Sequence, residues 1–349
     1  MASTAQERVN LMKLGRHKLC APGLRNTAIR ARFTAALLRS GGNATTYPID
    51  HETEHGPEYY LQRGMRDSFD PGAVIEVAQE GKVMAMAVLP GLGQVIGQMT
   101  KGDIPLIWKL NIGAGIEKNG DAITTPLYSD IRTAMKVAID NGAIAWGATY
   151  YEFSTNAPAM RRQLTEMDEA GAELGLGGVV WNYPRGSLIK GGDSDVLNQL
   201  HGFESIYNVT SGSFVFIKEK VSTPTGTVKD WETGKLEKDG WGKPEKEGFD
   251  DTEIRRFLSL NRADMIRYLV GVQHDHGIGS LMSGGAPQDP ERFGKDVKDG
   301  IGADRHIAFI AGRSTTRQIK KTEESFNVND AIGHMKKLNA AAPRVVIED

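Results

Sequence analysis

The sequence has little of three things that often reveal the class of a protein: cysteine, net charge and long apolar runs. Its 349 residues include one cysteine, Cys20, which excludes an internal disulfide and a cysteine-rich zinc site. A free thiol suits a reducing compartment, so we expect a cytoplasmic protein. The 42 Lys and Arg residues and the 44 Asp and Glu residues leave a net charge of −2. With no basic field, we expect no nucleic-acid partner.

Membrane segments are not expected either. Charges from Glu7 to Lys18 interrupt the start of the chain, which therefore lacks the apolar core of a signal peptide. The uncharged stretch 83–100 is broken by Pro90 and Gly91, so it predicts a strand, a turn and a short helix. Hydrophobic residues make up 40% of the chain and charged residues 25%, which indicates a protein that buries a core.

Short apolar runs recur along the chain, and most are followed by a longer amphipathic stretch. This alternation is typical of parallel strands joined by helices. The expected strands are 44–50, 83–89, 104–111, 143–150, 177–183, 213–220, 277–283 and 306–311. The expected helices include 127–140, 157–174, 193–202, 252–274, 290–300 and 323–338.

Eight strand-and-helix units predict a (β/α)8 TIM barrel, an α/β fold whose active site lies at the C-terminal ends of the strands. We expect residues 1–40 to form an N-terminal helical extension and residues 41–349 to form the barrel. The polar stretch 221–249 is rich in Gly, Lys and Glu and predicts a long loop excursion after the sixth strand. A lid, a subunit contact and a solvated loop all fit this excursion.

The segment 51–55 reads HETEH, the letters of the zinc-protease motif H-E-x-x-H. That motif places two histidines one turn apart on a long helix, whereas this copy follows a predicted strand and meets Gly-Pro at once. A polar loop at the mouth of the barrel fits this context better. A metal-dependent lyase using His51, Glu52 and His55 stays open as an alternative.

Two lysines end the sixth expected strand, in the run FIKEK at 216–220. The period of two puts Lys218 and Lys220 on one face of the strand. If that face lines the barrel, repulsion and desolvation favour the uncharged form of one amine, which is nucleophilic toward a carbonyl. An outward, solvated pair of lysines is the alternative.

Other strand ends carry aromatic or polar groups. Trp181 and Tyr183 share one face of the fifth strand, where a phenol could shuttle a proton and an indole could line a site, although packing is the usual role of such aromatics. Asp50 ends the first strand, and Lys109 and Asn111 end the third. These are positions at which barrels hold their catalytic groups.

The last two strands end in Ser283-Gly284-Gly285 and Gly312-Arg313. The loops after these two strands commonly bind phosphate in barrels, because glycine lets backbone N–H groups converge and arginine adds a charge-assisted fork. We therefore predict a phosphate site at these two strand ends.

Seven motifs, in this order, make the chain resemble the class I fructose-bisphosphate aldolases of the archaeal type, within the DeoC/LsrF-like group. They are YPIDHETEHG at 47–56, IPLIWKLN at 104–111, AIAWGAT at 143–149, VVWNYPRG at 179–186, FIKEK at 216–220, SGG at 283–285 and AGR at 311–313. The resemblance covers most of the expected barrel.

The resemblance implies a Schiff-base mechanism with no metal and no other cofactor. Lys218, rather than Lys220, corresponds to the imine-forming lysine of the family, Tyr183 to its proton-transfer group, and Asp50 to a carboxylate that assists proton traffic. The substrate-binding candidates are Trp181, Lys109, Asn111 and Arg185, and the phosphate-binding candidates are Ser283, Gly284, Gly285, Gly312 and Arg313.

The implied reaction is reversible cleavage of fructose 1,6-bisphosphate to dihydroxyacetone phosphate and glyceraldehyde 3-phosphate, a step of glycolysis and gluconeogenesis. Related aldolase-transketolase or thiolase chemistry on another phosphorylated sugar or ketose is the first alternative. A barrel that binds a phosphorylated metabolite as a sensor is the second. The resemblance also implies a homo-oligomer, with a decamer as the candidate size, and a phosphorylated sugar as the partner.

Overall fold

The computed structural model describes part of the chain in enough detail for a structural account. The described residues are 17–18, 22–50, 70–113, 121–189, 202, 212–220, 279–283, 291, 307–310, 327–342 and 344–346. Of the expected elements, helix 252–274, nearly all of helices 193–202 and 290–300, and the excursion 221–249 lie outside these residues.

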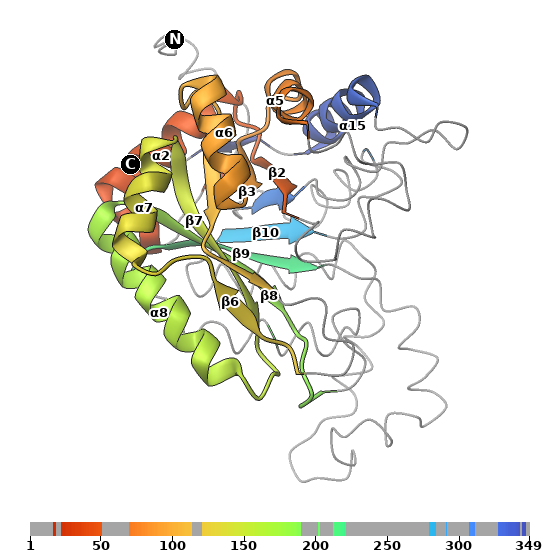
Figure 1. Cartoon of the computed structure of the whole chain (residues 1–349). Coiled ribbons are helices and arrows are strands. Elements are labelled where there is room, and N and C mark those ends of the chain that lie inside the picture. Colours follow the sequence, from red (N-terminus) through yellow and green to blue (C-terminus); the bar gives the residue numbers. More distant parts are fainter. Residues whose placement is uncertain are drawn as a thin grey trace, which may run out of the picture.

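Eight parallel strands close into a barrel, which confirms the predicted fold (Figure 1). Each expected strand coincides with one of them, and neighbours in the ring follow one another in the order of the chain. The last strand pairs with the first to close the ring. The strands are β2 (Thr45–Ile49), β3 (Ala85–Val88), β4 (Leu106–Lys109), β7 (Ala143–Tyr151), β8 (Gly177–Tyr183), β9 (Phe214–Lys220), β10 (Gly279–Ser283) and β11 (Ile307–Ile310).

Strands β2, β3, β4, β7 and β8 are buried on both faces, which suits their largely apolar sequences. Outward residues such as Trp108 and Trp146 pack in one cluster with the surrounding helices. Inward residues such as Ile107, Val179 and Phe216 pack in a second cluster. Successive side chains of a strand point to opposite faces, and residues in the middle of these strands alternate between the two clusters.

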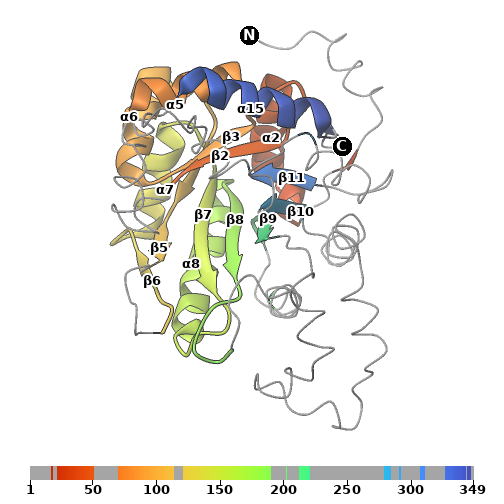
Figure 2. The same cartoon turned by 90° about the vertical axis from the view of Figure 1, so that its right-hand side faces the viewer.

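Helices cover the outside of the barrel. They are α5 (Pro71–Glu80), α6 (Pro90–Thr100), α7 (Ile131–Asp140), α8 (Ala157–Leu174) and α15 (Val328–Ala341). Helix α5 contacts α6, α6 contacts α7 and α7 contacts α8, and α15 lies beside α5 (Figure 2). Helix α8 has the predicted bounds. Helix α7 begins four residues later than predicted, because the side chain of Asp130 caps it by accepting a hydrogen bond from Thr133 N at 2.7 Å.

The segment before the barrel covers the N-terminal ends of β8 and β9. It consists of the 3-10 helix η1 (Pro22–Arg25) and the helix α2 (Thr27–Arg39), which is preceded by β1 (His17–Lys18), paired with β12 (Val345–Val346). A Cβ at Gly23 would lie 2.3 Å from the carbonyl oxygen of Ser213, so η1 approaches the start of β9 closely. The ring of Phe33 lies 5.8 Å from that of Phe216 inside the barrel.

The chain leaves the barrel earlier than expected after the third barrel strand. Strand β4 ends at Lys109, and Asn111 opens a short antiparallel hairpin made of β5 (Asn111–Gly113) and β6 (Thr124–Pro126). This hairpin stands at the C-terminal mouth of the barrel, between β4 and α7. None of the helices in the described part of the chain combines the length and the apolar character that a bilayer crossing demands.

Candidate active site at the C-terminal mouth of the barrel

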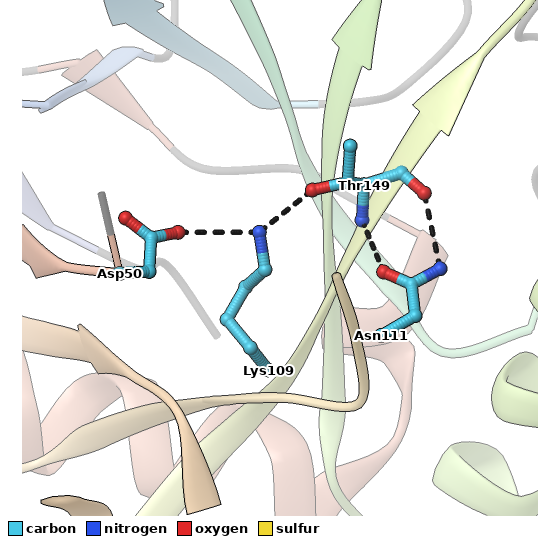
Figure 3. A network of polar contacts seen from close by, with 4 residues as sticks. All are labelled: Asp50, Lys109, Asn111 and Thr149. Atoms are coloured by element: carbon cyan, nitrogen blue, oxygen red, sulfur yellow. Dashed lines mark hydrogen bonds and ion pairs between the residues drawn. The ribbon is translucent and has the colours of Figure 1, made fainter. Parts of the chain in front are cut away.

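A buried ion pair lies at the C-terminal end of the barrel interior (Figure 3). Asp50 directly follows β2, and Lys109 is the last residue of β4. The Nζ atom of Lys109 lies 3.2 Å from Oδ2 of Asp50, and the two side chains are 0% and 3% exposed. Lys109 also donates a hydrogen bond to Oγ1 of Thr149, at 2.7 Å. Burying an ion costs several kcal/mol unless it is paired and hydrogen-bonded, so these contacts are what allows two charges inside the barrel.

The indole of Trp181 covers the ammonium group of this pair. Nζ of Lys109 lies 4.4 Å from the ring centroid of Trp181, within the range of a cation–π contact. Gly147 of β7 makes room for both side chains, since a Cβ there would lie 2.8 Å from the Trp181 ring and 3.2 Å from Cδ of Lys109. The glycine in the run AIAWGAT is therefore a packing requirement of the site.

Asn111 fastens the end of β4 to β7. Its Oδ1 accepts a hydrogen bond from Thr149 N at 2.6 Å, and its Nδ2 donates one to Thr149 O at 3.1 Å (Figure 3). The amide thus continues the sheet ladder after the main chain of β4 has turned away. This contact gives Asn111 a structural reason to be buried, and its predicted contact with substrate stays a prediction.

The register of the sheet places Lys218 in the same row. Thr149 of β7 is paired with Trp181 of β8, and Trp181 is paired with Lys218 of β9. Paired residues of neighbouring strands lie on the same face of a sheet. On β9, Phe216 belongs to the interior cluster and Ile217 to the outer one, so alternation also puts position 218 on the interior face.

An aromatic and cationic stack lies one row further toward the mouth. Tyr151, the last residue of β7, is paired with Tyr183, the last residue of β8, and their ring centroids are 6.1 Å apart. The guanidinium carbon of Arg185 lies 4.7 Å from the Tyr183 centroid and 6.0 Å from that of Tyr151. Tyr183 and the positive charge of Arg185 are therefore held together near the row that contains Trp181.

The predicted phosphate residues are placed only in part. Ser283 is the last residue of β10, and β10 is paired with both β9 and β11, as a shared site at the two final strand ends requires. Gly284, Gly285, Gly312 and Arg313 lie outside the described residues. The phosphate site therefore stays a prediction.

The histidines of the HETEH segment also lie outside the described residues. Within the part of the chain that is described, no group of three or more His, Cys, Asp and Glu side chains is arranged so that it could hold a metal ion.

Two tyrosines of the same strands are excluded from the interior by alternation. Tyr47 of β2 and Tyr150 of β7 both belong to the outer cluster. Burial raises the pKa of Tyr47 well above its usual value. Burial also raises that of Tyr150, although a hydrogen bond from Arg161 opposes the shift. These phenols stay protonated and act as packing groups.

Sequence reasoning missed Thr149 and Tyr151 as members of the site. The signal was present in the run AIAWGATYY at 143–151, where a period of two puts both residues on the same face as Gly147. This period did not predict a functional role for either residue, because threonine and tyrosine are also common in strands that have no such role.

These features define the class of the protein. It is a parallel (β/α)8 barrel whose interior becomes polar and ionic at the C-terminal ends of the strands, where barrel enzymes hold their active sites.

Comparisons with known sequences give similarities to aldolases. Residues 45–203 match the DeoC/LacD family aldolase. The chain is 31% identical over 158 residues to a class 1 fructose-bisphosphate aldolase of Halobacterium salinarum, an alignment that covers 45% of this chain and 57% of that protein. It is 24% identical over 276 residues to a probable class 1 fructose-bisphosphate aldolase of Chlamydia trachomatis, covering 78% and 73% of the two chains. Residues 45–203 of the chain are thus similar to the DeoC/LacD family aldolases, which confirms the resemblance seen in the motifs.

A solved structure agrees in fold. It is an archaeal fructose-1,6-bisphosphate aldolase with its catalytic lysine covalently bound to the carbinolamine intermediate of the substrate. The TM-score is 0.61 at 21% identity, over 90% of this chain and 99% of that one. At this identity the likeness establishes the barrel fold.

Proposed function

We propose that the protein is a class I aldolase that cleaves fructose 1,6-bisphosphate reversibly through an imine on Lys218. The observation that carries this proposal is the register of β8 with β9, which puts position 218 next to Trp181 on the interior face of the barrel. Trp181 in turn covers the buried pair of Lys109 and Asp50. A lysine at a position of this kind is what imine chemistry needs, because a dry site favours the neutral amine.

The reaction balances with the groups present. The Lys218 amine attacks the C2 carbonyl of the open-chain sugar, a carbinolamine forms, and loss of water gives the protonated imine. Tyr183 removes the proton of the 4-hydroxyl, the bond between C3 and C4 breaks, and glyceraldehyde 3-phosphate leaves. The electron pair of that bond remains as an enamine, which is protonated at C3 and hydrolysed to dihydroxyacetone phosphate and free Lys218. The protonated imine supplies the electron sink that a metal ion supplies in other aldolases.

The other site residues can assist proton transfer, contact the substrate and bind its phosphate. Asp50 lies at the end of β2 beside the Lys109 ammonium, where a carboxylate can assist proton transfer to and from the reacting carbons. Lys109 and Trp181 would line the substrate site with a charged and an aromatic group, and Arg185 would add a second positive charge near the mouth. Ser283, Gly284, Gly285, Gly312 and Arg313 would hold the phosphate of the three-carbon fragment.

The names of the relatives support this substrate, and the single cysteine supports a reducing compartment such as the cytoplasm. We also propose that the protein forms a homo-oligomer, as the family resemblance implies. Mass photometry of the purified chain tests that part separately.

The test of the function is borohydride trapping followed by intact mass and peptide mapping. With dihydroxyacetone phosphate or fructose 1,6-bisphosphate, we expect a stable adduct on Lys218 in the wild-type protein. Lys218→Met should lose both the adduct and cleavage of the sugar. Lys220→Met is the matched control, because it removes a lysine two positions further along the same strand, and it should keep both.

Several outcomes would contradict the proposal. An adduct on Lys220, or cleavage that persists in Lys218→Met, would overturn the role of Lys218. An adduct that forms with other ketoses but not with these two ligands would favour the related transketolase or thiolase chemistry. Activity lost on chelation would favour the metal-dependent alternative.

A further inference from the structure

Three loops at the mouth of the barrel meet at one carboxylate, that of Asp121, which precedes β6. The loop after β7 contributes Thr155, whose backbone N–H donates to Oδ2 of Asp121 at 2.5 Å and whose hydroxyl donates to the same atom. The loop after β8 contributes Ser187, whose N–H donates to Oδ1 at 2.8 Å and whose hydroxyl donates to Oδ2 at 2.9 Å. Asp121 therefore accepts hydrogen bonds from two loops while it belongs to a third.

The two donor loops also touch each other directly. The N–H of Leu188 donates to the carbonyl of Phe153 at 3.1 Å. Gly186 has a φ of +144°, and a Cβ there would lie 2.0 Å from that same carbonyl oxygen. A glycine is needed at this point, since another residue would separate the loops. The loop after β8 is thus closely packed on the loop after β7, and Asp121 binds both at their junction.

The loop that Asp121 holds contains two of the proposed functional side chains. Tyr183 ends β8, and the N–H of Arg185 donates to the carbonyl of Tyr183 at 2.7 Å. The turn 183–187 is therefore fixed at one end by strand β8 and at the other by the bonds from Ser187 to Asp121. Between these two points the guanidinium of Arg185 stacks on the Tyr183 ring.

We propose that Asp121 is a positioning residue, which holds the turn 183–187 so that Tyr183 and Arg185 face the part of the substrate beyond the cleaved bond. This inference rests on the proposed aldolase function. Lys218 belongs to a different strand, β9, so we expect Asp121 to serve cleavage and not imine formation. The two steps can be measured separately, and this makes the inference testable.

The electrostatics agree with a carboxylate that stays charged. Some desolvation raises the pKa of Asp121, but the hydrogen bonds from Thr155 and Ser187 outweigh it and hold the pKa well below its usual range. The contacts are at the surface, so water can satisfy the freed donors when the carboxylate is removed. An Asp121 variant should therefore fold.

The experiment compares Asp121→Ala with Asp130→Ala. Asp130 is the matched control, because its carboxylate also caps a backbone N–H at the surface but bonds within its own helix, to Thr133. For Asp121→Ala we expect borohydride trapping of dihydroxyacetone phosphate on Lys218 within about twofold of wild type. We expect kcat for cleavage of fructose 1,6-bisphosphate to fall by about 10- to 100-fold, since small misplacements of reacting groups have effects of this size. Asp130→Ala should change neither.

Two results would overturn the inference. One is cleavage at the wild-type rate in Asp121→Ala, and the other is an equal loss of trapping and cleavage, which would indicate general damage to the site. The double variant Thr155→Val/Ser187→Ala provides a further check. Adding Asp121→Ala to it should cause a smaller loss than Asp121→Ala causes in the wild-type protein, because the hydroxyl hydrogen bonds are already removed while those from the two backbone N–H groups remain.

Hydrogen exchange separates this inference from the proposed function. If the wild-type protein neither traps a ketose nor cleaves one, the aldolase proposal fails, and the amides of Ser187 and Leu188 still test the loop junction. Faster exchange of these amides in Asp121→Ala, with no change in Asp130→Ala, would support Asp121 as the residue that holds the turn. Unchanged exchange would overturn it.

Discussion

The two ends of the barrel are built from the same strands and differ in what they bury. At the N-terminal end, η1 and α2 insert Leu24 and Phe33 into an apolar cluster with strand residues such as Ala85 and Val215. At the C-terminal end, the interior contains the ion pair of Asp50 and Lys109.

The comparison shows how one fold separates stability from function. The apolar end lowers the free energy of the folded state through area removed from water. The ionic end contributes little by itself, because pairing has to offset the loss of hydration of two charges. Under the proposed function, the chemistry of the site explains why a charged pair that adds so little stability is present. Changes at the two ends should therefore have different consequences, which the following experiments measure.

The largest expected effect comes from Lys109→Met. Without the ammonium, Asp50 keeps a buried charge but loses the ion-pair partner at 3.2 Å. We expect the free energy of unfolding to fall by about 3–5 kcal/mol, and cleavage to fall by about 100-fold or more. Urea unfolding and steady-state kinetics on the folded protein measure the two losses.

The double variant Asp50→Leu/Lys109→Met is its control. Replacing both charges with apolar groups should recover most of the lost stability, since a buried ion pair is often no more stabilising than apolar residues of similar size. It should recover no activity. Recovery of both, or of neither, would contradict the separation between the two ends.

Phe33→Ala tests the opposite end. The side chain is fully buried against Phe216, so its removal leaves a cavity and should lower the free energy of unfolding by about 3–5 kcal/mol. Turnover per folded molecule should stay at the wild-type value, with the fraction folded determined by borohydride trapping at low temperature. A marked loss of kcat per trapped site would show that the apolar end does act on the chemistry.

The smallest expected effect concerns a buried group that belongs to neither end. Burial and the charge of Lys337 lower the pKa of His334, on α15, from 6.5 to about 4. Between these two values the unfolded chain binds a proton that the folded protein does not, so stability is complete above pH 6.5 and is lost as pH falls toward 4. Urea unfolding at pH 7 and pH 5 should show a loss that is smaller in His334→Gln than in wild type by about 1–2 kcal/mol.

The variant His334→Gln also tests whether the outer helical layer affects catalysis. Its profile of kcat against pH should match that of wild type, because His334 lies in the outer helical layer. Equal losses of stability in both proteins would show that His334 does not contribute to acid sensitivity.

Much of the fold could be predicted from the sequence because its signals are local. The run AIAWGAT is apolar enough to be buried on both faces, and β7 lies where that run predicts it. The residues from Ala157 to Leu174 have their apolar side chains at helical spacing and are capped by Gly175 in the left-handed conformation, and α8 has those bounds. The eight strands and their order follow from such runs.

The site could be predicted only as a set of strand ends. Lys109 and Asp50 were candidates because each ends a strand, but their ion pair depends on the barrel bringing β2 and β4 to the same interior. The two hydrogen bonds between the Asn111 side chain and the main chain of Thr149 could not be predicted. A side-chain amide that replaces a main-chain group of a strand has no sequence pattern of its own. The same holds for Asp121, whose partners are 34 and 66 residues away.

By itself the sequence determined the eight barrel strands and the alternation of faces along them, because periodicity and turn residues act over a few positions. It also carried a resemblance to an aldolase family, through motifs that lie on those strands. The tertiary structure alone decided which strand ends meet: the pairing of Lys109 with Asp50, the cover of Trp181 over that pair, and the convergence of three loops on Asp121. These contacts join residues far apart in the chain, and closure of the barrel is the physical event that brings them together.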